Sequence, residues 1–104
     1  MHDYRTELAA ISADTSKGQN TDVFSSDFTL KRAGNLVRIS IQTDTTAAIN
    51  VVPNSGSALH LGNATANTLA TFTFALDHGR TWNIQHSHSG DVAIEHCVVQ
   101  EVQQ

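Results

Sequence analysis

Residues 37–42 read Val-Arg-Ile-Ser-Ile-Gln, and residues 71–76 read Thr-Phe-Thr-Phe-Ala-Leu. In both stretches a large apolar side chain alternates with a polar or small one. Successive side chains of a β-strand point to opposite faces, so this period places the large apolar residues on one face of a sheet. Antiparallel sheets with one buried and one solvated face have this pattern. The two stretches therefore predict strands that cover a core.

The same period continues along the rest of the chain from residue 22. Runs of this kind recur with turns every ~8–12 residues, which is typical of sandwiches and barrels. Residues 53–56 read Pro-Asn-Ser-Gly and residues 77–79 read Asp-His-Gly, both favourable turn sequences. The sequence predicts an all-β fold, an antiparallel β-sandwich or jelly roll. The predicted inward side chains are Phe24, Phe28, Val37, Ile39, Ile41, Ile49, Val51, Leu59, Leu61, Phe72, Phe74, Leu76, Trp82, Ile84, Val92, Ile94 and Val98, with Phe72, Phe74 and Trp82 among the most buried.

The N-terminal segment has a different pattern. Tyr4, Leu8 and Ile11 recur at i, i+4 and i+7, which is the spacing of one helical face. We therefore expect a short helix or extended arm over residues 1–21, followed by the sandwich domain over residues 22–104. A helix this short is marginal alone, so its apolar stripe needs a surface to pack on. We take the three residues as candidate contacts with another chain; the alternative is that they cover an edge of their own sandwich.

Composition and charge restrict the partners. The 104 residues suit one domain, and 15% charged residues with a net charge of −4 argue against a nucleic-acid or anionic-membrane partner. Residues 1–5 do not begin a signal peptide, because no basic start is followed by an apolar stretch. No window resembles a membrane span. We expect the protein to be made in the cytoplasm.

Catalytic signatures are missing from the sequence. No nucleophile elbow, phosphate-binding loop, dinucleotide fingerprint or zinc-protease motif occurs. The ten carboxylates are scattered singly, whereas acid–base catalysis needs titratable groups that converge. Cys97 is the single cysteine and lies in an apolar run, so we expect a buried thiol. The sequence predicts a protein that is not an enzyme and has no cofactor.

Residues 85–90 read Gln-His-Ser-His-Ser-Gly, which places His86 and His88 on one face of a strand. Imidazole is the commonest protein ligand for transition metals, but two ligands do not fill a coordination sphere. One interpretation is a metal bound across a threefold axis by one such pair per chain, as in trimeric phage fibre proteins. The favoured interpretation is a hydrogen-bonded strand end. We therefore predict no bound metal.

The polar strand faces offer a third kind of site. The residues expected on exposed faces could hydrogen-bond a sugar; they are Thr45, Thr46, Thr71, Thr73, Thr81, Asn83 and Gln85. Carbohydrate sites usually also present an aromatic ring, and Trp82 is expected to face inward. A solvated sheet face is the favoured interpretation.

Several runs together resemble the small structural proteins of tailed bacteriophages. They are Thr21-Asp-Val-Phe-Ser-Ser-Asp-Phe-Thr-Leu30, Val37-Arg-Ile-Ser-Ile-Gln-Thr-Asp-Thr-Thr-Ala-Ala-Ile-Asn-Val51, Thr71-Phe-Thr-Phe, Gly79-Arg-Thr-Trp-Asn-Ile-Gln85 and Val98-Val-Gln-Glu-Val102. The resemblance covers residues 21–102 and implies a non-enzymatic virion component with a β-sandwich or jelly-roll body.

Within this class the resemblance is to capsid decoration (cement) proteins. These are often trimers that sit where capsomers meet, with N-terminal arms that reach neighbours. The resemblance implies a homotrimer in the virion, bound to the major capsid protein or another virion protein. The alternatives are a tail fibre, an adaptor or a receptor- or carbohydrate-binding domain. The helical spacing in residues 1–21 departs from the arms of well-known decoration proteins.

Overall fold

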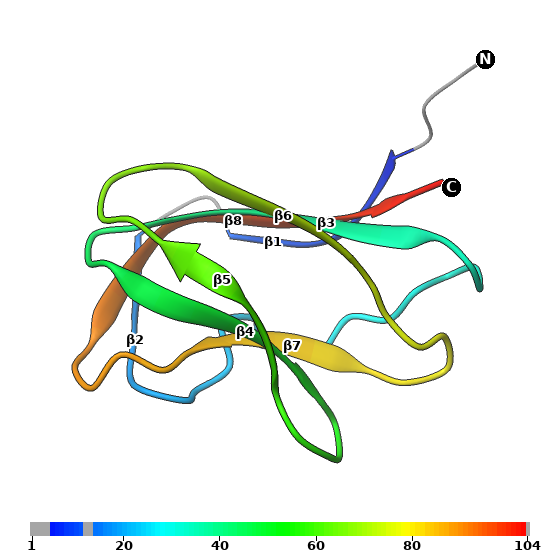
Figure 1. Ribbon diagram of the computed structural model, residues 1–104, viewed down its shortest axis with the longest axis horizontal. Coiled ribbons are helices and arrows are strands. Elements are labelled where there is room, and N and C mark those ends of the chain that lie inside the picture. The colour runs from blue at the N-terminus through cyan, green and yellow to red at the C-terminus, as the bar shows by residue number, and fades with distance from the viewer. Residues whose placement is uncertain (1–4, 12–13, 104) are drawn as a thin grey trace.

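The computed structural model describes residues 5–11 and 14–103, which form two antiparallel sheets packed face to face (Figure 1). None of these residues lies in an α-helix, and the predicted all-β sandwich is confirmed. The strands are β1 (Arg5–Ile11), β2 (Thr15–Lys17), β3 (Leu36–Thr43), β4 (Ala47–Pro53), β5 (Leu59–Ala64), β6 (Ala70–Ala75), β7 (Trp82–His86) and β8 (Val92–Val102).

β8 pairs with three strands of the first sheet, β1, β2 and β3. The order of this sheet is β1-β8-β3-β6, and β2 pairs with the beginning of β8. The second sheet has the order β5-β4-β7. The chain passes from one sheet to the other between β3 and β4, β5 and β6, β6 and β7, and β7 and β8. These crossings make the two sheets parts of one folding unit.

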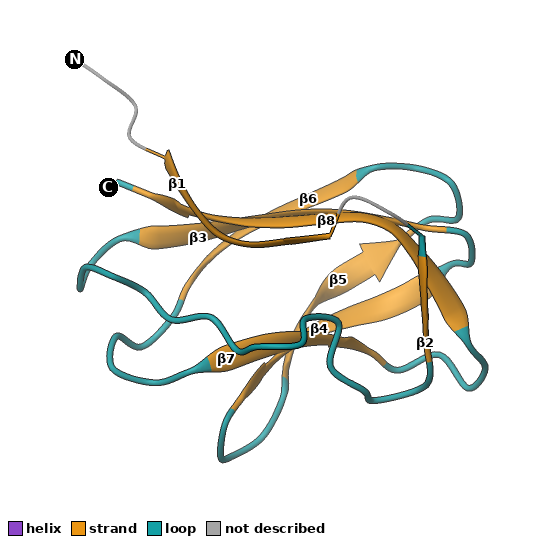
Figure 2. Cartoon of the chain, turned by 180° about the vertical axis from the view of Figure 1, so that it is seen from behind, coloured by secondary structure: helices purple, strands orange, loops and turns teal. Residues whose placement is uncertain are grey.

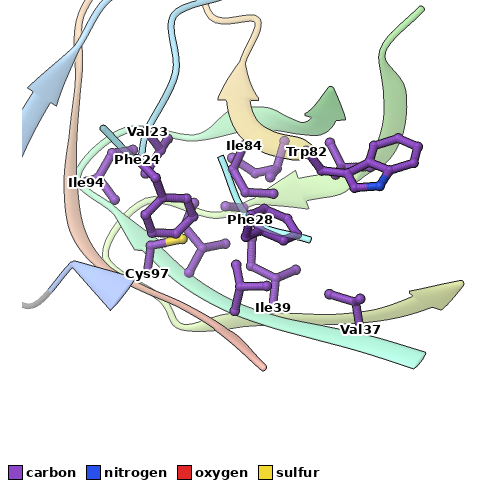
Figure 3. Close-up of a cluster of buried hydrophobic side chains, with 14 of the residues drawn as sticks. Val23, Phe24, Phe28, Val37, Ile39, Trp82, Ile84, Ile94 and Cys97 are labelled. Atoms are coloured by element: carbon purple, nitrogen blue, oxygen red, sulfur yellow. The ribbon is translucent and has the colours of Figure 1, made fainter. Parts of the chain in front are cut away.

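The core lies between the sheets, and most of the predicted inward side chains fill it (Figure 3). Ile39 of β3, Ile49 of β4 and Ile84 of β7 are completely buried. Burial of a side chain of this size stabilises the fold by about 1.5–3 kcal/mol. The buried apolar residues that are not among the predicted inward side chains are Val23, Leu30, Ala47, Ala64, Cys97 and Val99.

A β-bulge in β8 overturns the predicted position of Val98. At Glu95 the register between β8 and β3 shifts by one residue. One extra residue exchanges the inward and outward side chains of the strand that follows it. Cys97 and Val99 are therefore buried, and Val98 lies on the outer face of the sheet.

Four other predicted core residues lie on the edge strands β5 and β6 and are not fully buried, Leu59, Leu61, Phe72 and Phe74. Phe72 and Phe74 are half-buried, and β6 is the outermost strand of its sheet. Leu59 begins the edge strand β5 and is 48% exposed. The prediction that both phenylalanines are among the most buried residues is wrong, whereas Trp82 is 2% exposed, as predicted.

The helix considered for the N-terminal segment is wrong for residues 5–11, which form β1. Its register with β8 shifts between Glu7 and Ala9, so Leu8 is the extra residue of a bulge. Because of this bulge, Leu8 and Ile11 both pack against the core although they are three residues apart. A bulged strand thus produces a spacing that also fits a helical face. Tyr4 lies outside the described residues.

Residues 20–28, here called the strap, run along the outer edge of β7 (Figure 2). Asn20 N–H donates to His86 O and Val23 N–H donates to Ile84 O, each at 2.8 Å. Phe28 and Trp82 exchange two backbone hydrogen bonds, also at 2.8 Å. The strap therefore serves as an irregular additional strand that covers the β7 edge.

Asn83 holds the middle of the strap, where the backbone ladder is interrupted. Its Oδ1 accepts from Phe24 N–H at 3.0 Å, and its Nδ2 donates to Phe24 O at 2.9 Å and to Asp27 Oδ1 at 2.8 Å. The sequence pattern places Asn83 on an exposed face, but it is almost completely buried. The expectation was wrong because the strap covers this face.

Candidate interaction surface

The outer edge of β1 is a free sheet edge. In residues 5–11 and 14–103, β1 pairs with β8 on one side and with no strand on the other. A free edge presents backbone N–H and C=O groups that can pair with another strand. The β7 edge of the other sheet is covered by the strap, so the two edges on this side of the sandwich differ.

A groove of about 430 Å³ lies between β1 and the strap. Leu8, Ile11, Val23 and Phe24 form its apolar part, and Ser25 belongs to its exposed rim. We call it the β1 groove; its lining residues are Leu8, Ala9, Ala10, Ile11, Thr15, Lys17, Val23, Phe24, Ser25, Ser26 and Asp27. The structure thus brings two of the three candidate contact residues, Leu8 and Ile11, to the wall of a groove beside a free edge.

The outer side of the first sheet is a second open surface, which we call the flat face. The strand pairings arrange its side chains in three rows across β1, β8, β3 and β6. None of these side chains is buried. The rows are Arg5-Val102-Leu36-Ala75, Glu7-Gln100-Arg38-Thr73 and Ala10-Val98-Ser40-Thr71.

His86 is completely buried, and both of its ring nitrogens have partners. Nε2 lies 2.7 Å from Lys17 O, which can only accept, so Nε2 carries the hydrogen. Nδ1 accepts from His88 N–H at 3.1 Å. His86 would have to give up a hydrogen bond to bind a metal through either nitrogen. The predicted absence of a metal at this pair stays a prediction, and this geometry is its physical reason.

Cys97 is completely buried, as expected for a structural thiol. Desolvation raises the pKa of its thiol from the ordinary 9.0 to about 12, because burial disfavours the thiolate. A thiol in this state is a poor nucleophile at neutral pH.

The raised pKa of Cys97 predicts a loss of stability in alkaline solution. Above pH 9 the unfolded chain ionises its thiol while the folded chain does not, so the free energy of unfolding falls as pH rises from 9 towards 12. The loss reaches roughly 4 kcal/mol at pH 12, at about 1.36 kcal/mol per pKa unit. Urea unfolding of wild type and Cys97→Ala between pH 8 and 11 measures the difference. Equal pH slopes for the two proteins would contradict the burial of the thiol.

Glu101 is a buried carboxylate that ties the turn before β3 to the end of β8. Its Oε1 accepts from Lys31 N–H at 2.6 Å and its Oε2 from Asn35 Nδ2 at 2.7 Å. It borders an open pocket of about 510 Å³ that Arg32 also lines. Because both carboxylate oxygens accept bonds within the chain, we assign Glu101 a structural role.

Comparison of the chain with protein-family models and with curated proteins finds no match. Among residues 5–11 and 14–103, no group of three or more His, Cys, Asp and Glu side chains is arranged to hold a metal ion. The described part of the chain also contains no helix of the length and apolarity that crossing a membrane requires.

Proposed function

We propose that this protein is a non-enzymatic structural component of the virion of a tailed bacteriophage, a capsid decoration protein that attaches through the β1 groove. The observation that carries the proposal is the free edge of β1 beside an apolar groove. An extended segment of a partner can add to such an edge as a strand, with alternate side chains entering the adjacent pocket. Leu8 and Ile11 supply apolar contacts for those side chains.

The partner we propose is the major capsid protein or another virion protein, and the proposed form on the particle is a homotrimer. The sequence resemblance supports both proposals. The low content of charged residues, 15%, fits a chain that binds protein surfaces. A receptor- or carbohydrate-binding domain has weaker support, because Trp82, the one tryptophan, is 2% exposed and cannot stack on a sugar.

Reconstitution on phage particles that lack this protein tests the proposal. Ser25→Arg places a long charged side chain on the rim of the β1 groove, and Ser57→Arg places the same side chain on an exposed turn outside it. Wild type and Ser57→Arg are expected to bind particles equally in a co-sedimentation titration. Ser25→Arg is expected to bind roughly tenfold or more weakly, a loss of at least about 1.4 kcal/mol.

Leu8→Gln is a second variant, which removes apolar contact from the groove wall. Circular dichroism and a melting curve establish that each variant is folded before binding is compared. Point substitutions are better suited than deletion of residues 1–20, because that deletion removes β1 and β2 from the sheet. Equal binding by all four proteins would reject the groove as the attachment site, and no binding by wild type would reject the function.

A further inference from the structure

The flat face carries three charged side chains, Arg5, Glu7 and Arg38. The last two lie in one row, have opposite signs and have no partner within the described residues. Glu7 pairs with Gln100 on one side of β8, and Arg38 pairs with Gln100 on the other. Neighbouring strands lie about 4.8 Å apart, so the two charged residues are roughly 10 Å apart. The one ion pair in the described part of the chain joins Arg80 and Asp77.

Apolar side chains lie in the two neighbouring rows, next to Arg5 in one and to Ser40 and Thr71 in the other. Val98 and Val102 project from β8, and Leu36 projects from β3 beside Val102. All three are partly exposed and lie outside the group of side chains that pack on the core. The solvated face of an antiparallel sheet is normally polar, so valines along its central strand indicate a surface that becomes covered.

We infer that the flat face binds the flat face of a second copy of this chain, about a two-fold axis that runs along β8. Rotation about this axis brings β8 against β8 and β1 against β3 of the second copy. Glu7 of each copy then faces Arg38 of the other, and the Gln100 amides meet at the axis. Val98 and Val102 each face their own counterparts. An interface of this kind is self-complementary, as a two-fold contact requires.

Charge complementarity indicates that the flat face binds a second copy of this chain. Glu7 and Arg38 lie at equal distances on either side of β8, so one rotation pairs both at once, while Arg5 comes to lie opposite Leu36 of the second copy. Aligned sheets pack about 10 Å apart with strand directions within about 30°, which suits side chains of this length. The bulge at Glu95 interrupts the register of β8 with β3, and the beginning of β8 bends towards the second sheet (Figures 1 and 2), so the flat face ends on this side.

The size of the flat face sets the expected strength of the contact. Rotation about β8 superposes β1, β8 and β3 of the two copies and leaves β6 outside the contact. Three rows over three strands cover about 14 by 20 Å, or roughly 280 Å². This is about a third of the ~800 Å² that each partner buries in a standard stable interface. We therefore expect reversible association at micromolar or higher concentration, weakened by salt because the charged pairs lie at a surface. This contact is separate from the β1 groove and from the trimer proposed for the particle.

Sedimentation analysis of the purified chain from ~10 µM to ~1 mM tests the inference, a range that covers weak contacts. Wild type is expected to be in monomer–dimer equilibrium. Glu7→Arg and Arg38→Glu each create two like-charged pairs across the axis, and each is expected to weaken the dimer at least tenfold. An equimolar mixture of the two variants is expected to associate as wild type does, because each mixed dimer has two Arg–Glu pairs.

Asp14→Arg and Arg32→Glu are the matched controls, since they change the net charge by the same amounts at exposed positions off the flat face. They are expected to dimerise as wild type does. A wild type that stays monomeric, or forms only trimers, would overturn the inference. So would variants that dimerise unchanged or a mixture that stays monomeric. Ser25→Arg is expected to keep the dimer, so failure of this inference is distinguishable from failure of the attachment site.

Discussion

Replacing Asn83 by Ala is expected to lower the free energy of unfolding by about 3–5 kcal/mol. The substitution leaves the N–H and C=O of Phe24 without the partners that Asn83 now supplies. Each buried backbone group without a partner costs about 1–3 kcal/mol, and the bond to Asp27 is lost as well. The melting temperature of a domain of this size should fall by roughly 15 °C or more.

Gln85→Ala is the matched control for Asn83→Ala. Gln85 lies two residues further along β7 and makes one exposed side-chain hydrogen bond, to Asp22 Oδ1 at 2.8 Å. Loss of an exposed bond costs about 1 kcal/mol or less, because water replaces the partner. Thermal unfolding of both variants measures the contrast. If Asn83→Ala were no more destabilising than Gln85→Ala, the strap would not depend on Asn83.

Trp82→Ala is the second substitution with a large expected effect, a loss of about 3–5 kcal/mol. The indole is almost completely buried, and its Nε1–H donates to Asp77 O at 3.3 Å. The guanidinium carbon of Arg80 lies 5.2 Å from the centre of the ring. Truncation therefore opens a cavity, removes a hydrogen bond and frees the loop between β6 and β7.

Phe74→Ala provides the comparison for Trp82→Ala. Phe74 is half-buried on the edge strand β6, so solvent can fill part of the space that its ring leaves. The expected loss is about 1–2 kcal/mol, below the range for fully buried aromatic rings. Urea unfolding of the two variants gives both values. A larger loss for Phe74→Ala would contradict the positions that the structure gives to these rings.

The fold class could be predicted from the sequence because the period of two is a local property of each strand. Ile39, Ile84 and Ile94 are completely buried, as the alternation predicts. The bulge at Glu95 could not be predicted, because an extra residue is defined only against the partner strand. The prediction for Val98 failed for this reason.

The candidate sites were predictable only in part. Leu8 and Ile11 were chosen by helical spacing, and they reach one surface because β1 contains a bulge. The importance of Asn83 has no signal in the alternating pattern, since its burial depends on residues 20–28, far away in the sequence. The flat face depends on pairing between four strands, which the sequence predicts as elements but does not order.

Quantitative mass spectrometry of purified particles is the most direct test of the proposed function. The particles should come from the phage or prophage whose genome encodes this chain, and gradient purification should remove proteins that are not bound. We predict peptides of this chain at a fixed ratio to the major capsid protein in every particle fraction. Their absence from the particles, with the chain abundant in the infected-cell lysate, would contradict a structural role in the virion.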